Sequence, residues 1–136
     1  NYTYQEGKVD VKNDNSYEKY LSGLRIAPAR LNSYIKWNDK AQKLQLGAYH
    51  MYSFKRDKFE PAATGKYDEG EGPVKAFSIF NFQGSYKVNS LMSVGLGIEN
   101  IFNTSYFTPT SMYTARDAEY VRGNGRYYTV SLSFNY

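Results

Sequence analysis

The C-terminal residues 126–136 alternate strictly between apolar and polar positions, and the two sets would lie on opposite sides of a β-strand. One side would carry Tyr128, Val130, Leu132, Phe134 and Tyr136, and the other Tyr127, Thr129, Ser131, Ser133 and Asn135. A soluble sheet buries its apolar side and hydrates the polar one. A transmembrane β-barrel uses the same pattern in reverse, with apolar side chains toward lipid and polar ones toward the lumen. The strand is therefore predicted, but its surroundings are left open at this point.

Five further segments show strand-like alternation, and no stretch has the 3.6-residue period of a helix, which predicts an all-β chain. The expected strands are residues 1–5, 29–37, 42–55, 74–88, 91–103 and 126–136. Such consecutive strands form an antiparallel meander.

The connections between these strands alternate in length. Residues 6–27, 56–73 and 104–124 are long connections, whereas residues 38–41 and 89–90 are tight turns. Short turns at one end and long loops at the other are typical of outer-membrane barrels. Six strands cannot close a barrel around a lumen, since about eight is the small end of what is seen. We therefore expect this chain to be part of a larger barrel whose missing part is N-terminal.

Aromatic residues make up 18% of the chain and include 15 tyrosines. Polar residues interrupt every apolar stretch well before the roughly 18 residues that a membrane helix needs. Several aromatics fall near the expected strand ends, where a barrel carries its two interfacial girdles. Those near the short turns or the terminus are Trp37, Tyr86 and Tyr136, and those toward the long connections are Tyr52, Phe54 and Tyr128.

The alternation divides the strand residues into two predicted surfaces. The set expected to face lipid is Leu44, Leu46, Phe80, Phe82, Val94, Leu96, Val130, Leu132 and Phe134. The set expected to face the lumen or a plug is Asn32, Lys36, Gln45, Asn81, Gln83, Lys87, Glu99 and Ser131.

The sequence shows no catalytic constellation, so we expect no enzyme, no cofactor and no metal centre. Cysteine is absent, and the single histidine, His50, falls on the lipid-facing set without ligand partners. Asp10 and Asp14, with the neighbouring asparagines, resemble part of a calcium loop, but the required twelve-residue spacing is not met. The net charge of +4 is scattered along the chain and forms no nucleic-acid motif. Residues 123–125 (Gly-Asn-Gly) precede no helix, and we interpret them as a hinge before the last strand.

Several motifs, taken in order, resemble the C-terminal segment of TonB-dependent outer-membrane receptors, and of ferric-siderophore receptors in particular. Residues 95–107 (GLGIENIFNTSYF) resemble the penultimate strand of that family. Residues 123–126 (GNGR) resemble the start of its terminal strand, and residues 28–32 (PARLN) resemble the start of an earlier descending strand. The final aromatic, Tyr136, resembles the signal that the barrel-assembly machinery reads.

The resemblance implies that residues 1–136 form the last six of about 22 strands in a Gram-negative outer-membrane barrel. It implies import of a large scarce nutrient, most simply a ferric siderophore, with energy from TonB through a plug that lies outside this chain. Expected partners are outer-membrane lipid and lipopolysaccharide, the rest of the barrel, the plug, TonB and the assembly machinery, but no nucleic acid. Aromatic rings and guanidinium groups suit an anionic aromatic iron chelate. The candidate ligand residues in the outer loops are Tyr17, Tyr20, Tyr113, Arg116 and Tyr120.

Two other functions remain open from the sequence. The first is a passive porin-type barrel, which would lack a plug. The second is a soluble β-sandwich that binds carbohydrate, in which Leu132 and Phe134 would line a core.

Overall fold

The computed structural model describes residues 1–10, 12–21, 26–58, 74–108 and 122–135. Within these ranges the chain forms β-strands, and none of the segments is a helix long and apolar enough to cross a membrane. The strands are β1 (Tyr2–Thr3), β2 (Lys8–Val9), β3 (Lys19–Tyr20), β4 (Arg30–Asn38), β5 (Leu44–Ser53), β6 (Phe77–Lys87), β7 (Met92–Glu99) and β8 (Tyr127–Phe134).

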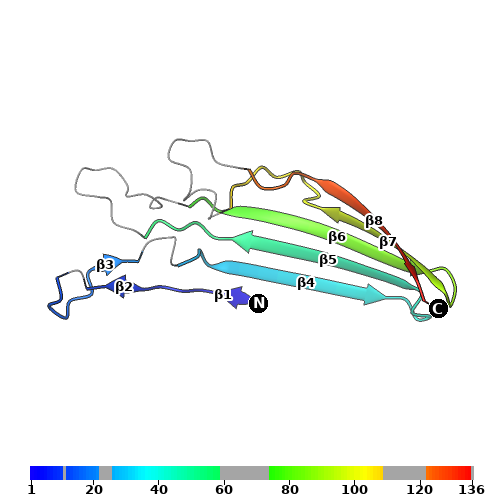
Figure 1. Cartoon of the computed structure of the whole chain (residues 1–136), viewed down its shortest axis with the longest axis horizontal. Helices are drawn as coiled ribbons and strands as arrows, with labels where there is room; N and C mark the ends of the chain where they lie inside the picture. The colour runs from blue at the N-terminus through cyan, green and yellow to red at the C-terminus, as the bar shows by residue number, and fades with distance from the viewer. Residues whose placement is uncertain (11, 22–25, 59–73, 109–121, 136) are drawn as a thin grey trace.

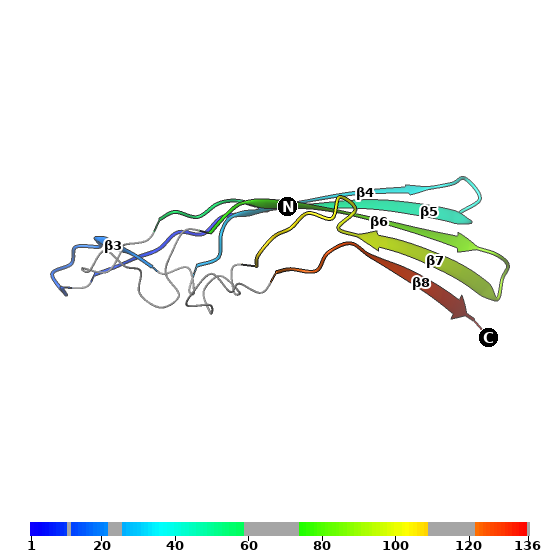
Figure 2. The same cartoon turned by 90° about the horizontal axis from the view of Figure 1, so that it is seen from above.

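Six of these strands form one antiparallel sheet in the order β1-β4-β5-β6-β7-β8, which confirms the predicted meander (Figure 1). All five pairings in this sheet are antiparallel, and each of the later strands pairs with the next one along the chain. The described part of the sheet is open, with β1 and β8 at its edges. Figure 2 shows the strands fanning out from β4 to β8, so the sheet is twisted and curved rather than flat.

Asparagine and aspartate side chains form the two short turns. After β4, the Asp39 carboxylate accepts a hydrogen bond from the backbone N–H of Leu44, and Gln42 takes a positive φ of 53°. After β6, the Asn89 side chain accepts from the backbone N–H groups of Leu91 and Met92, both at 2.8 Å. Asx side chains of this kind satisfy the backbone where no ladder partner exists. Both turns lie at the same end of the sheet (Figure 1).

The structure corrects several predicted boundaries. β7 ends at Glu99 rather than at residue 103, because Asn100 and Asn103 have positive φ angles of 50° and 52° and the chain turns there. The first strand is only two residues long, Tyr2–Thr3. The polar stretch 6–27, predicted as a connection, contains the short antiparallel pair β2 and β3. Sequence patterns gave no signal for that pair because each strand is only two residues long, too short to show a period of two.

Few apolar side chains are buried in the described part of the chain. The buried ones are Ile26, Val74 and Ile79, all toward the long-connection end. Along the strands, the apolar side chains are exposed instead, as with Val130 at 69%. A β-sandwich would cover them with a second sheet, but the described strands form only this one sheet and the small β2–β3 pair. The fold therefore does not support the soluble sandwich.

Candidate functional site

The pairing register divides the sheet residues into two sides, because residues opposite one another in an antiparallel pair point the same way. Leu46, for example, lies opposite Trp37 on β4 and opposite Gly84 on β6. We call the side that carries Leu46 the apolar side and the other the polar side. All nine residues predicted to face lipid fall on the apolar side, and all eight predicted to face the lumen fall on the polar side. Which environment each side meets stays a prediction.

The apolar side is a nearly continuous hydrocarbon surface. Five of its members exceed 60% exposure, namely Ile35, Tyr128, Val130, Leu132 and Phe134. His50 also lies on this side, where its ring stacks on Phe80 with centroids 4.2 Å apart. Its Nε2 is 2.9 Å from the hydroxyl of Ser78. His50 is therefore packed against Phe80 and hydrogen-bonded to Ser78.

The polar side is hollowed by a groove of about 540 Å³. Gln83 lies in the middle of the groove, with glycines opposite it on both neighbouring strands, Gly47 on β5 and Gly97 on β7. Tyr34 and Tyr49 stand at one edge, with ring centroids 6.3 Å apart. The remaining polar members along the groove are Lys36, Gln45, Asn81, Ser85, Glu99, Thr129 and Ser131. The groove therefore offers both signs of charge and several amide and hydroxyl groups to a partner.

Asn100 connects the end of β7 to the start of β8. Its side chain is 3% exposed, and its amide nitrogen donates to the backbone carbonyls of Thr104 and Asn124 at 2.9 and 3.0 Å. Its side-chain oxygen accepts from the backbone N–H of Thr104, and its own backbone N–H donates to Asn81. An asparagine is suited to this position because it tolerates positive φ and has both donor and acceptor groups.

Two further contacts join the same segments. The Asn103 side chain accepts from the backbone N–H of Arg126, and the Arg126 guanidinium donates to the carbonyl of Ile101. Gly123 lies against the ring of Tyr106, which a Cβ at this position would overlap. The two sequence motifs recognised separately, residues 95–107 and 123–126, are therefore one structural unit. Sequence reasoning missed this because their contact is long-range.

Only part of the predicted ligand set lies in the described ranges. Tyr17 is 65% exposed beside the β2–β3 pair. Tyr20 lies in β3, with the Lys8 ammonium 4.6 Å and the Lys58 ammonium 5.7 Å from its ring centroid. The other candidate ligand residues, Tyr113, Arg116 and Tyr120, lie outside the described residues, as does the predicted assembly signal Tyr136.

Three carboxylates meet between β2 and β3. The acidic oxygens of Asp10, Asp14 and Glu18 lie within 4.8 Å of one another. Asp10 and Asp14 accept backbone N–H groups of the turn, for example that of Asn15 at 2.7 Å. Glu18 pairs with Lys12 at 3.2 Å. Each acid therefore has a partner within the turn, and Glu18 joins the two predicted aspartates.

The known proteins that match this chain are receptors and transporters. No family model matches the sequence. The rhizobactin receptor of Rhizobium meliloti (strain 1021) is 24% identical over 135 residues, which cover 93% of this chain. The match covers 16% of that receptor, so the chain spans about a sixth of the length of this curated relative.

Solved structures show the same fold at low sequence identity. The ferric-catecholate import receptor Fiu of Escherichia coli K12 matches with a TM-score of 0.66 and 18% identity, over 98% of this chain and 18% of that one. The copper transporter OprC matches with a TM-score of 0.67 and 15% identity, over 85% of this chain and 18% of that one. The ferric enterobactin receptor PfeA of Pseudomonas aeruginosa matches with a TM-score of 0.57 and 22% identity, over 78% of this chain and 16% of that one.

These relatives are receptors and transporters, which agrees with the expectation of a non-enzymatic protein. The sequence match and the shared six-stranded fold both extend over most of this chain and over only a small part of each relative. The chain is therefore a segment homologous to the C-terminal part of the TonB-dependent receptors, the β-barrel proteins of the Gram-negative outer membrane.

Proposed function

We propose that this segment is the C-terminal wall of a TonB-dependent importer that carries a ferric siderophore across the outer membrane. The observation that supports this most strongly is the separation of the sheet into a hydrocarbon side and a grooved polar side. A sheet that lies in water rarely exposes an apolar surface of this extent. A barrel wall needs an apolar outer surface and a polar inner one.

In this proposal the groove on the polar side receives the plug. Gly97 leaves room for a close approach by another segment of chain, because a Cβ there would meet only Thr129, at 3.6 Å, whereas Gln83 and Ser131 already cover Gly47 and Gly95. Lys36 and Glu99 supply opposite charges, and Gln83 and Asn81 supply amide groups. Such a surface suits a partner held by hydrogen bonds and ion pairs that must also be released, because no large apolar contact has to be broken.

The chemistry of this segment favours a metal chelate over bare copper as the cargo. Copper binds to thiolate, thioether and imidazole ligands. The chain has no cysteine, its single histidine, His50, is on the apolar side, and its three methionines are the only other side chains of this kind. Relatives named for rhizobactin, ferric catecholates and enterobactin point the same way. Tyr17 remains a candidate contact for such a ligand because it is exposed at the long-connection end.

Uptake measurements test the proposed function directly. Cells that lack their own siderophore receptors and express the full-length protein should accumulate radioactive iron from one of three chelates: ferric rhizobactin, ferric enterobactin or a ferric hydroxamate. We expect accumulation to stop when TonB is deleted. Accumulation of small solutes that continues unchanged without TonB would instead identify a passive porin.

Filling the groove should disturb the seating of the plug. At Gly97 an added Cβ would lie 3.6 Å from that of Thr129, so a side chain fits the sheet and projects into the groove. We expect Gly97→Leu to leave the barrel folded but to make cells more sensitive to vancomycin, which a seated plug excludes. Gly97→Ala is the size control and should behave like the parent. Equal vancomycin sensitivity in Gly97→Leu and the parent would show that the groove is not a plug contact.

A further inference from the structure

The sequence contains a single asparagine–glycine pair, Asn124-Gly125, in the segment that leads into β8. Asparagine is a thermolabile residue. It loses its side-chain amide most readily before glycine, because glycine has no Cβ to shield its backbone nitrogen. Hydrogen bonds that hold the side-chain amide or that nitrogen slow this reaction in a folded protein. The contacts of Asn124 and Gly125 therefore determine whether the pair is labile here.

Both reacting groups of this pair are exposed and form no hydrogen bond with the described part of the chain. Asn124 is bonded only through its backbone carbonyl, which accepts from the Asn100 amide at 3.0 Å. The backbone N–H of Gly125 has no acceptor among the described residues, whereas the next N–H, that of Arg126, donates to Asn103 at 2.9 Å. The Gly125 nitrogen can therefore react with the Asn124 side chain without breaking a hydrogen bond of either group.

Other asparagines at the turns of the sheet have side chains that are held in place. The Asn100 side chain is bonded to backbone groups of Thr104 and Asn124. The Asn89 side chain, in the short turn after β6, accepts from two backbone N–H groups, both at 2.8 Å. Neither Asn100 nor Asn89 is followed by glycine. Asn124 thus combines a labile sequence with an unbonded side chain.

We propose that Asn124 is a site of spontaneous deamidation in the folded protein and is converted to isoaspartate and aspartate. Solvent hydroxide takes the proton from the Gly125 nitrogen, which attacks Cγ of Asn124 and forms a new bond between nitrogen and carbon. The bond between Cγ and Nδ2 breaks, and this nitrogen takes up protons from water and leaves as ammonia. Water then opens the resulting succinimide ring, at the backbone carbonyl to give isoaspartate or at Cγ to give aspartate. Water is the only co-reactant, and no group is oxidised or reduced.

Isoaspartate at this position weakens the junction between β7 and β8. It turns the backbone carbonyl that Asn100 contacts into a side-chain carboxylate, and it lengthens the main chain before Arg126 by a methylene group. The hydrogen bond from the Arg126 N–H to Asn103 then loses its alignment. We therefore expect protein aged in warm, mildly alkaline buffer to unfold at a lower guanidinium concentration than fresh protein. This consequence does not depend on the imported substrate or on which side of the sheet meets lipid.

Ageing of the full-length protein, folded in detergent, tests the proposal. After incubation, isoaspartate is labelled with an isoaspartyl methyltransferase and located by mass spectrometry of the digested protein. We expect the label in the peptide that contains Asn124, and its complete loss in Asn124→Ala. The Asn124→Ala protein should also keep its unfolding midpoint during ageing. An Asn124 side chain that stays an amide in the folded parent, under conditions that convert it in urea, would overturn the proposal.

The variant Ser90→Gly separates the effect of the structure from that of the sequence pair. It creates a second asparagine–glycine pair at Asn89, whose side chain is held by two backbone N–H groups. In the folded variant we expect Asn124 to react and Asn89 to stay intact, whereas in urea both should react alike. Equal reaction of Asn89 and Asn124 in the folded variant would contradict the argument from hydrogen bonds. Should Ser90→Gly not fold, the comparison of the folded parent with the parent in urea decides alone.

Discussion

Replacing Leu132 with arginine should lower the free energy of unfolding of the full-length barrel by about 2 to 4 kcal/mol. Leu132 is 61% exposed on the apolar side, opposite Val94 and within the hydrocarbon surface. An arginine there would place its charge in lipid near the bilayer midplane, where hydration is lost. The measurement is guanidinium unfolding of the protein refolded into phosphatidylcholine vesicles.

The adjacent residue provides a matched control for this prediction. Ser133 lies on the polar side, opposite Ser93, and Ser133→Arg should change the unfolding free energy little, because that side chain would stay in water. The contrast between the two variants therefore reports on sidedness rather than on the tolerance of β8 for arginine. Equal stability of Leu132→Arg and the parent in vesicles would contradict the lipid-facing assignment.

The meander and its two sides could be predicted from the sequence because both follow from a period of two. A one-residue shift in register would move every side chain to the other side, so a consistent pattern over five strands fixes the pairing. The register of Leu46 with Trp37 and Gly84 follows this rule. The alternation of long and short connections also predicted which end of each strand meets a short turn and which meets a long connection.

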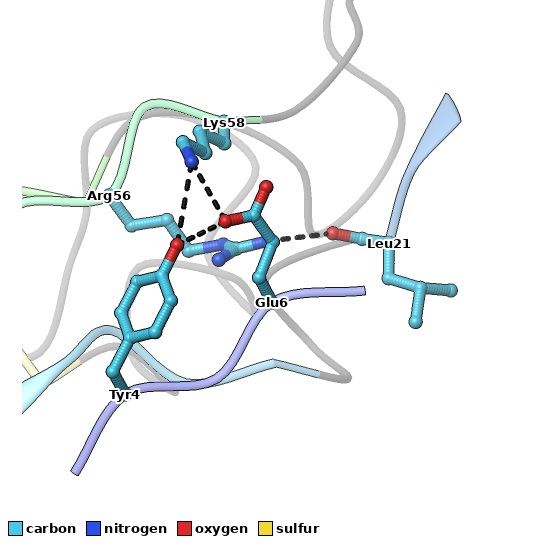
Figure 3. Close-up of polar contacts among 5 residues, drawn as sticks. All are labelled: Tyr4, Glu6, Leu21, Arg56 and Lys58. Carbon is cyan, nitrogen blue, oxygen red and sulfur yellow. Dashed lines mark hydrogen bonds and ion pairs between the residues drawn. The ribbon is translucent and has the colours of Figure 1, made fainter. Parts of the chain in front are cut away.

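The end of β7 could not be predicted in this way. Residues 100–103 (Asn-Ile-Phe-Asn) include isoleucine and phenylalanine, which are common in strands, so the predicted strand extended to residue 103. The structure turns there because the Asn100 side chain satisfies the backbone groups of Thr104 and Asn124, the latter 24 residues away. Likewise, the pairing of β2 with β3 depends on contacts between separate segments. The burial of Arg56 depends on such contacts too, because its guanidinium reaches Leu21 (Figure 3). Local patterns hold no information on such contacts.

Replacing Asn100 with alanine should cost about 2 to 4 kcal/mol of unfolding free energy, because a buried group that loses its partner costs about 1 to 3 kcal/mol. The change would leave the carbonyls of Thr104 and Asn124 and one backbone N–H without the partners that they have now. It would also place alanine at a φ of 50°, which asparagine tolerates better. The control is Asn124→Ala, which keeps the backbone carbonyl that Asn100 contacts and should behave like the parent. Guanidinium unfolding in vesicles measures both variants. If Asn100→Ala were as stable as Asn124→Ala, the β7–β8 junction would be held by the Asn103 and Arg126 contacts instead.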